Sequence, residues 1–333
     1  MIQSGSTKPK FGAASTETMR GDLRCYATAC MHGVKYMARF MLSVLCSSTF
    51  VPISIKYSPH EGSLMTTPLH AFASRRRPAV MLMGLGLLCV QLGAQAEGLE
   101  PETTLSYNVG ALSDYRVRGI AQTSFKPAFQ GGIDWAHRSG FYAGVFGSNV
   151  RWVKELNGAT KGSVEVDLYG GFKGAIDELP LTYDFGVITY QYPGNNSGVG
   201  GVLPAGTFTN ANTVEVYGAV SYKIVTLKVN RSIGNFLGNP NSSGSMYFDL
   251  SAAVDLGNAF SLTPHIGRQT ISNQAGDLGN YTDLSLTLAK DFGNGLVLSA
   301  MATRTNADTV FYTDTNGRYL GKSALVLGLK YNF

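Results

Sequence analysis

The most constraining feature of this chain is an alternation of apolar and polar residues, with a period of two, from Thr103 onward. The stretches VEVDLYGGF (164–172), MYFDLSAAVDL (246–256) and TDLSLTLAK (282–290) are the clearest cases. Successive side chains of a strand point to opposite faces, so the pattern predicts strands with one apolar face. No helix is expected after Ala96. Twelve strands are predicted, near residues 103–113, 127–137, 141–150, 162–173, 181–192, 213–223, 225–233, 245–256, 260–268, 280–291, 296–305 and 322–333.

The connections between these segments alternate in length. Short turns are expected at 137–140, 174–180, 223–224, 257–258 and 293–295. The long connections are rich in Gly, Asn, Ser and Thr and cover 114–126, 151–161, 193–212, 234–244, 269–279 and 306–321. Alternating short turns and long loops, with an even number of strands, are typical of bacterial outer-membrane barrels. The sequence therefore predicts an all-β fold, a transmembrane antiparallel barrel of about twelve strands.

Aromatic residues flank the short turns and the end of the sequence. They are Trp135, Phe141, Phe172, Tyr183, Tyr222, Phe260, Phe292 and Phe333. Amphipathic rings settle at a membrane interface, which favours a membrane barrel. A soluble barrel would turn its apolar face inward, and alternation alone does not distinguish the two arrangements. The turn pattern, the terminal phenylalanine and an export signal favour the membrane.

The export signal is expected at residues 65–96. Three arginines (Arg75–Arg77) precede an apolar run, Pro78–Gly93, which ends at Ala94-Gln95-Ala96. A positive segment, an apolar segment and an A-x-A site are the parts of a cleaved secretory signal peptide. Residues 1–64 are interpreted as a misassigned start or an unusual leader without a function, which leaves 97–333 as the barrel.

Charge and cysteine content change at the predicted cleavage site. Ten of the 27 Lys and Arg residues and three of the 22 Asp and Glu residues precede it, leaving 17 basic and 19 acidic residues. The resulting formal charge of −2 gives no reason to expect a nucleic-acid partner. All four cysteines also precede the site, so no disulfide or thiol chemistry is expected in the mature chain.

The polar faces of the predicted strands supply candidates for a pore lining. In a water-filled barrel, charges on the inner face set the selectivity of the channel. An alternative left open is that they only solvate the lumen or pair with one another. The candidates are Asp134, Glu165, Asp167, Lys173, Asp184, Glu215, Lys228 and Asp249.

Catalytic and metal sites are not expected. The mature chain holds two histidines, His137 in a short turn and His265 beside Pro264, and no serine stands in a G-x-S-x-G setting. No third group to orient either histidine is apparent. Two separated histidines without cysteine are also a poor set of transition-metal ligands. The prediction is a protein that is not an enzyme and needs no cofactor.

One stretch, Leu112–Val150, carries more specific motifs. Its SDYR, RG, QT, PA and QGG groups and Asp134 are followed by GFYAG and SNV. Together they resemble the opening of the TorF family of proposed bacterial porins. The strand VEVDLYGGF and the ending LGLKYNF are also similar to that family. The resemblance implies an outer-membrane barrel with a porin role, but neither a substrate nor a catalytic residue.

Asp114, Arg116 and Arg118 stand where the first long loop begins, and Gly119 permits a sharp turn there. One hypothesis is that this loop folds into the mouth and its arginines constrict the pore. The other is that these residues form a structural corner in which Asp114 or Asp134 pairs with an arginine.

The sequence ends on an apolar series at every second position, which includes Leu329, Tyr331 and Phe333. This ending is similar to the signal that the barrel-assembly machinery reads. Expected partners are therefore this machinery, the Sec translocon, outer-membrane lipids of a Gram-negative bacterium, and the permeating solute. A homo-oligomer is left open.

The predicted function is a passive channel for small polar solutes or ions. The alternatives are a non-conducting barrel that acts through its loops as an adhesin or receptor, and a barrel lipase.

Overall fold

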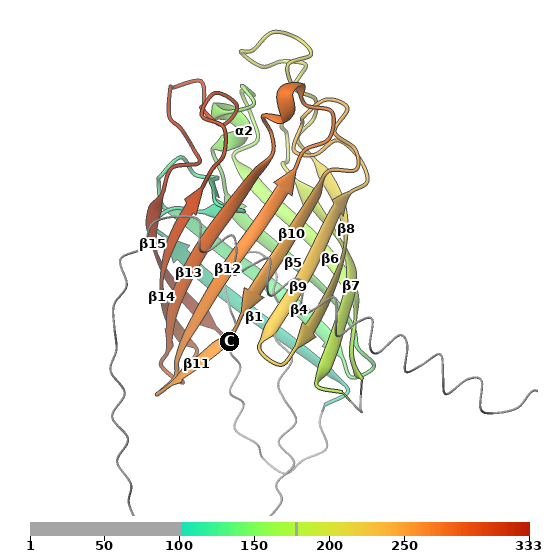
Figure 1. Cartoon of the computed structure of the whole chain (residues 1–333), viewed down its shortest axis with the longest axis vertical. Coiled ribbons are helices and arrows are strands. Elements are labelled where there is room, and N and C mark those ends of the chain that lie inside the picture. The colour runs from blue at the N-terminus through green and yellow to red at the C-terminus, as the bar shows by residue number, and fades with distance from the viewer. Residues whose placement is uncertain (1–100, 177–178) are drawn as a thin grey trace, which may run out of the picture. The chain divides into compact units, whose positions relative to one another are not determined.

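One antiparallel sheet closes on itself to form a barrel (Figure 1). The computed structural model of the protein describes residues 101–176 and 179–333, so the predicted leader and signal peptide lie outside the described residues. The wall consists of β1 (Thr103–Leu112), β4 (Ala128–His137), β5 (Phe141–Asn149), β6 (Val164–Ile176), β7 (Leu181–Gln191), β8 (Thr213–Tyr222), β9 (Val225–Ser232), β10 (Met246–Ala252), β11 (Val254–Gly257), β12 (Phe260–Thr270), β13 (Tyr281–Asp291), β14 (Leu296–Thr305) and β15 (Ala324–Asn332).

Two pairings close the ring. β1 pairs with β15 from Asn108 opposite Asn332 to Leu112 opposite Gly328, and β10 pairs with both β9 and β12. β10 and β11 form one strand that is interrupted at Ala253, so the wall has twelve strands. The predicted twelve-stranded antiparallel barrel is confirmed. Because every interior strand has two partners, its backbone N–H and C=O groups are bonded within the wall, as a membrane requires.

The apolar face of each strand points outward. On β13, Leu284, Leu286 and Leu288 are 47%, 47% and 41% exposed, while Asp283 between Thr282 and Leu284 is 2% exposed. The same alternation holds on β15, where exposed leucines flank the buried Val326. A contiguous apolar outer wall is unfavourable in water at roughly 25 cal/mol per Å². This placement excludes the soluble barrel and identifies a transmembrane barrel.

Aromatic rings surround the short-turn end of the outer wall. Phe141 and Phe172 pack with their ring centroids 5.0 Å apart, and Tyr183 lies 6.1 Å from Phe172. Tyr331 and Phe333 pack at 4.9 Å on the closing strand. The eight predicted aromatic residues therefore lie near one rim, where amphipathic side chains meet a membrane interface.

The long loops fold over the other end of the barrel. They contain a short helix, α2 (Trp152–Glu155), and a 3-10 turn, η1 (Ala275–Asp277), so the expectation of no helix after Ala96 was wrong at these two places. Four-residue and three-residue helices are too short to produce a helical period in the sequence. Two buried apolar clusters lie at this end, one around Tyr115, Trp152 and Tyr192 and one around Tyr281 and Leu320.

Candidate functional site

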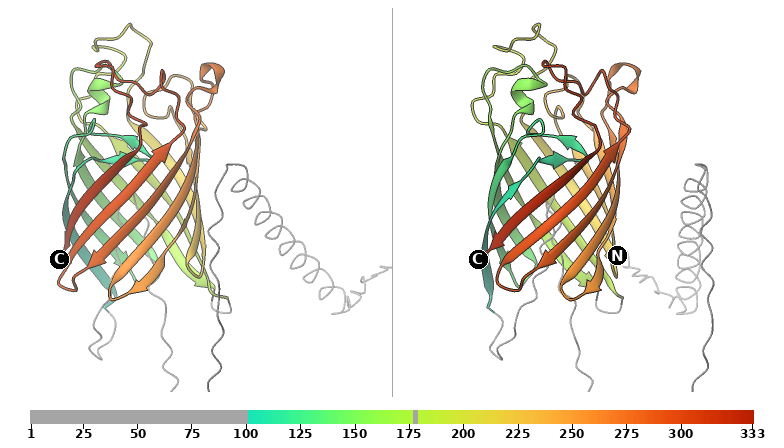
Figure 2. Two further views of the ribbon diagram at one scale, coloured as in Figure 1. Left: turned by 60° about the vertical axis from the view of Figure 1, so that its left-hand side comes forward. Right: turned by 90° about the vertical axis from the view of Figure 1, so that its left-hand side faces the viewer.

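A small hairpin from the first long loop lies inside the barrel. β2 (Arg116–Val117) pairs with β3 (Ile120–Ala121), and Figure 2 shows these two short teal strands within the loop-side part of the barrel. Its two turn residues, Arg118 and Gly119, have φ of +50° and +77°. Positive φ at both central residues defines a tight hairpin turn that suits glycine. A Cβ on Gly119 would lie 2.4 Å from Thr305 Cγ2 and 2.9 Å from Asp283 Cβ. The tip of the hairpin is therefore in close contact with β13 and β14 of the wall.

Arg118 connects the hairpin tip to the wall opposite β1. Its guanidinium donates to Glu215 Oε2 on β8 at 2.6 Å and to Gln269 Oε1 on β12 at 2.7 Å. The same group lies 4.4 Å from the ring centroid of Tyr247 on β10. β8, β10 and β12 surround the position opposite β1 in the ring of strands, so the hairpin spans the lumen. This geometry matches the hypothesis that the loop constricts the barrel.

Arg116 anchors the base of the same hairpin. Its Nε donates to Asp114 Oδ2 at 2.6 Å, and its Nη1 donates to the carbonyls of Gly119, Leu320 and Lys322. The Asp114–Arg116 pair therefore has the form of a structural corner, whereas Arg118 reaches across the lumen. The two hypotheses thus apply to different arginines. Asp134 pairs with no arginine in the described part of the chain; it accepts a hydrogen bond from Tyr169 instead.

Acidic side chains lie under the hairpin. Glu165 accepts hydrogen bonds from the phenols of Tyr115 at 2.8 Å and Tyr192 at 2.7 Å. Burial, followed by the charge of Glu165, raises the pKa of both loop tyrosines well above the ordinary range, so both remain donors. Asp167 lies two residues further along β6, is fully buried, and has no partner on either carboxylate oxygen among the described residues. The wall thus presents two buried carboxyl groups below the hairpin.

A row of charges runs around the lumen below this level. Cross-strand pairing places Lys173 opposite Asp184, then Ala219, then Lys228 opposite Asp249. Lys228 Nζ lies 3.9 Å from the ring centroid of Tyr217. Basic and acidic groups therefore alternate along the pairing direction.

Lumen tyrosines hold several of these acids in place. Tyr142 donates to Asp184 Oδ1 at 2.5 Å and also bonds to Tyr217. Tyr169 donates to Asp134. These inward tyrosines were absent from the predicted set because aromatic residues were expected at the membrane interface. Their strand parity is the signal that could have found them, as each shares a face with a polar residue.

All eight predicted pore-lining residues have inward-facing side chains: Asp134, Glu165, Asp167, Lys173, Asp184, Glu215, Lys228 and Asp249. The structure adds Asp255, Asp283, Asp291, His265, Lys330 and the loop residue Arg118 to the charged groups and histidines of the lumen. Strand parity places Asp283 and Lys330 inward, because Leu284 next to Asp283 and both Leu329 and Tyr331 next to Lys330 face outward.

His265 has neighbours that the sequence did not indicate. Its Nε2 lies 3.0 Å from Asp249 Oδ2, and its Nδ1 lies 3.4 Å from Ser285 Oγ and 3.6 Å from Asp283 Oδ1. These residues come from β10, β12 and β13, which the barrel places side by side. Ser285 lies in the middle of β13, which is paired with β12 on one side and β14 on the other. The backbone N–H groups near Ser285 therefore donate to neighbouring strands and are not free to form an oxyanion hole.

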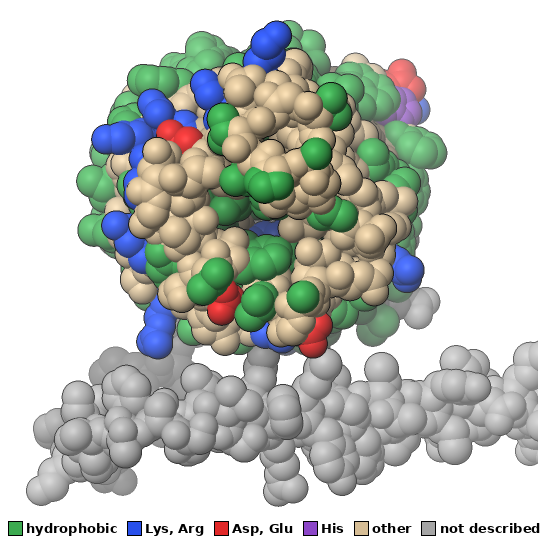
Figure 3. Space-filling view, turned by 90° about the horizontal axis from the view of Figure 1, so that it is seen from above, with side chains coloured by type: hydrophobic (Ala, Val, Ile, Leu, Met, Phe, Trp, Pro, Cys, Tyr) green, Lys and Arg blue, Asp and Glu red, His purple; other side chains and the backbone are tan. Residues whose placement is uncertain are grey.

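Seen from the loop end, the loops cover most of the mouth and leave a small hollow near its centre, with a basic side chain at its floor (Figure 3). Within residues 101–176 and 179–333, no three His, Cys, Asp or Glu side chains are grouped so as to hold a metal ion. The helices in the same described part of the chain include none that is long and apolar enough to cross a membrane.

Comparison with known proteins identifies one family. The family described as "Bacterial protein of unknown function (Gcw_chp)" matches residues 95–333. No curated protein matches the sequence.

Several solved structures are similar to the barrel. One, the KdgM porin in complex with disordered oligogalacturonate, is 6% identical, with 69% of this chain and 99% of that chain covered and a TM-score of 0.42. The NanC porin is 10% identical with the same coverage and TM-score. OccK5 of Pseudomonas aeruginosa is 14% identical, with 70% of this chain and 67% of that chain covered and a TM-score of 0.34. Identity this low says nothing about what this chain binds or passes.

Proposed function

The chain belongs to the Gcw_chp family of bacterial proteins of unknown function, and we propose that it is a narrow passive channel of the outer membrane for small polar solutes or ions. The observation that carries the proposal is the hairpin held across a polar lumen by Arg118 and Glu215. A closed barrel with an apolar outer wall is the form in which strands cross a membrane, and a constricting loop sets the size of what passes. The narrower TorF-family assignment rests on the Leu112–Val150 motifs and is part of this proposal.

We further propose that the channel prefers cations. Counting inward-facing strand residues together with Arg118, acids outnumber bases by nine to four: Asp134, Glu165, Asp167, Asp184, Glu215, Asp249, Asp255, Asp283 and Asp291 against Arg118, Lys173, Lys228 and Lys330. A low-dielectric wall strengthens the field of such charges inside a narrow lumen, so the excess of acids raises the local concentration of cations.

Recording from a planar bilayer tests both statements. The refolded mature chain is expected to insert with discrete conductance steps, and a KCl gradient is expected to give a reversal potential of cation-selective sign. A refolded barrel that inserts without any steps, in the wild type and in Arg118→Ala alike, would exclude the channel. A reversal potential of the opposite sign would exclude the cation preference.

The second candidate is a non-conducting barrel that acts through its loops. The two buried apolar clusters at the loop end favour it, because packed loops present a fixed surface to a partner. In that case the bilayer remains silent even after Arg118→Ala, which removes the contact that holds the hairpin across the lumen. A channel closed only by the hairpin would instead begin to conduct in this variant.

We propose that the protein is not an enzyme, although His265, Ser285 and Asp249 lie together in the lumen. Ser285 lacks free N–H donors nearby, and its side chain faces away from the lipid that a lipase would cleave. A phospholipid hydrolysis assay of the wild type is expected to show no activity. Hydrolysis that disappears in both His265→Ala and Ser285→Ala would establish the lipase instead.

The location and the partners belong to the same proposal. The outer membrane is supported by the barrel form and by the predicted signal peptide, which also implies passage through the Sec translocon and the barrel-assembly machinery. For the orientation, a cysteine introduced at Asn196 in a long loop is expected to react with a membrane-impermeant maleimide on intact cells. A cysteine at Ser139 in a short turn is expected to remain unlabelled, and the reverse result would invert the topology.

A further inference from the structure

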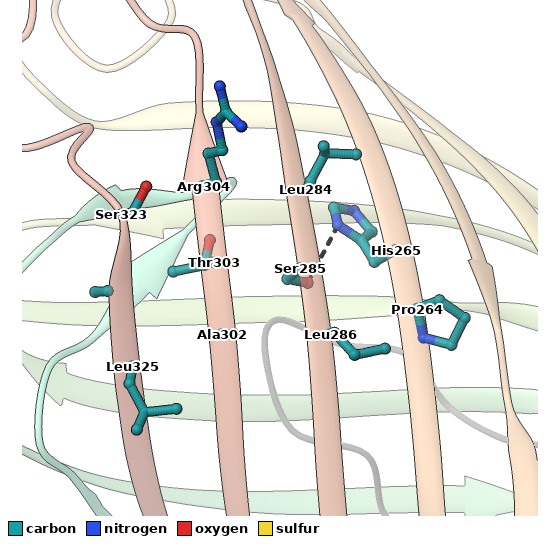
Figure 4. Close-up of a pocket in the computed structure, with 11 residues that line it drawn as sticks. Pro264, His265, Leu284, Ser285, Leu286, Ala302, Thr303, Arg304, Ser323 and Leu325 are labelled. Atoms are coloured by element: carbon teal, nitrogen blue, oxygen red, sulfur yellow. Dashed lines mark hydrogen bonds between the residues drawn. The ribbon is translucent and has the colours of Figure 1, made fainter. Parts of the chain in front are cut away.

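A shallow groove runs along the outer face of β14 (Figure 4). β14 presents Ala300 and Ala302 outward, each between leucines of its two neighbours: Leu286 and Leu325 flank Ala302, and Leu288 and Leu327 flank Ala300. An alanine side chain ends at Cβ, whereas the flanking leucines extend further from the wall. The central strand therefore forms the floor of a groove with apolar walls on both sides.

The loop-side end of the groove is basic. Arg304 lies two residues beyond Ala302 on the same face of β14, and Figure 4 shows its side chain extending toward the loop end. It is exposed, and no described residue forms an ion pair or hydrogen bond with its guanidinium. Arg268 on β12 is also outward and exposed, and its guanidinium forms one hydrogen bond among the described residues, to Thr282 Oγ1 at 3.3 Å.

Charge on this part of the wall has one sign only. The outward-facing positions of β12 to β15 contain no Asp or Glu, whereas the nearby acids Asp283 and Asp249 point into the lumen. An unpaired guanidinium next to an apolar surface is suited to a ligand with a phosphate head and a hydrocarbon tail. Arginine binds phosphate through paired, charge-assisted hydrogen bonds.

We propose that this groove binds one phosphate-bearing lipid with a net negative head group in the leaflet around the loop end, with an acyl chain along Ala300 and Ala302 and its phosphate at Arg304 and Arg268. The four residue steps from Ala300 to Arg304 span about 13 Å at the rise of a strand. That length approaches the ~15 Å depth of one hydrocarbon leaflet, so the head and tail contacts can form together. The inference requires the membrane placement of the barrel but does not depend on whether the barrel conducts.

Native mass spectrometry of the detergent-solubilised barrel tests the site. The protein is titrated with phosphatidylglycerol and, separately, with phosphatidylcholine carrying the same acyl chains. One phosphatidylglycerol is expected to bind in preference to phosphatidylcholine. Arg304→Gln is expected to lower its affinity about tenfold, because a charge-assisted pair is lost. Ala302→Leu, which fills the groove, is expected to have an effect of the same size.

Two matched variants serve as controls. Arg231→Gln removes an outward arginine at the loop end of β9, and Ala143→Leu enlarges an outward alanine on β5; both lie away from the groove and are expected to leave binding unchanged. Heat-modifiable mobility on a detergent gel verifies that each variant is folded, and Arg304→Lys replaces any glutamine variant that fails this test, with a smaller loss expected.

Equal binding of the two lipids, or equal loss in all four variants, would overturn the proposal. A protein dimer that Ala302→Leu disrupts, without a bound lipid in the wild type, would make the groove a contact between copies of the chain and would overturn it as well. Conductance is a separate readout: Arg304→Gln is expected to conduct like the wild type, so a failed lipid site and a failed channel give different results.

Discussion

Replacing Arg118 with alanine is expected to loosen the hairpin that crosses the lumen. In the structure the Arg118 side chain is 9% exposed and that of Glu215 is 1% exposed, with 2.6 Å between Nη2 and Oε2. Removing one partner of such a buried pair typically costs about 3–5 kcal/mol. Glu215 keeps hydrogen bonds from Tyr190 at 3.2 Å and Asn230 at 3.1 Å, so we expect the lower end, about 3 kcal/mol.

The loss of this free energy destabilises the docked position of the hairpin and not the strands of the wall. Each 1.4 kcal/mol is a factor of ten, so the equilibrium between the docked and displaced hairpin shifts by about 100-fold. The Asp114–Arg116 pair remains and holds the base of the hairpin, and the ladder hydrogen bonds of the twelve wall strands are unaffected. The barrel should therefore stay folded while its narrowest part opens more often.

Single-channel recording measures this change directly. The Arg118→Ala variant is expected to show larger or longer open events than the wild type at the same voltage and salt. Adding Glu215→Gln to Arg118→Ala is expected to change the size and duration of the open events little further, since the partner of Glu215 is already absent. Arg138→Ala, at an exposed arginine 3.8 Å from Glu102, is the matched control. Identical conductance and open times in the wild type and Arg118→Ala would refute the constriction.

Three further predictions concern the same barrel. Gly119→Val is expected to increase conductance as Arg118→Ala does, because φ is +77° at this position and a Cβ would collide with Thr305; an unchanged current would contradict the wall contact. Asp184→Asn is expected to move the reversal potential in a KCl gradient toward zero, since a lumen charge is lost, whereas Asp255→Asn at the exposed short-turn end should have a much smaller effect, because water and salt screen that carboxylate. The unboiled protein is expected to migrate differently from the boiled protein on a detergent gel, because the closed sheet has no unpaired edge from which to unfold; identical mobility would argue against closure.

The strands and their facing could be predicted because both depend on local pattern. Side chains alternate along any strand, so the leucines between Asp283 and Ala289 already divide β13 into an outer and an inner face. The antiparallel order followed from the alternation of short turns with long loops. The alternation alone did not indicate whether the apolar face pointed outward to lipid or inward to a core, because that depends on how the sheet closes.

The contents of the lumen depended on residues far apart in the chain. Arg118 meets Glu215 across 97 positions and Gln269 across 151, and no local period records such a distance. The sequence therefore left two hypotheses for the first loop, and the structure assigned a corner to Arg116 and a crossing to Arg118. The cluster of His265, Asp249 and Ser285 likewise exists only because neighbouring strands align in register.

The same division applies to the outer wall. Each outward alanine and leucine of β13, β14 and β15 could be assigned to the apolar face from the sequence, yet the groove requires Ala302 to lie level with Leu286 and Leu325. A period of two is a property of a single strand and can be read from neighbouring residues. Register, loop packing and the filling of the lumen are set when the sheet closes, because closure brings residues together that the chain keeps far apart.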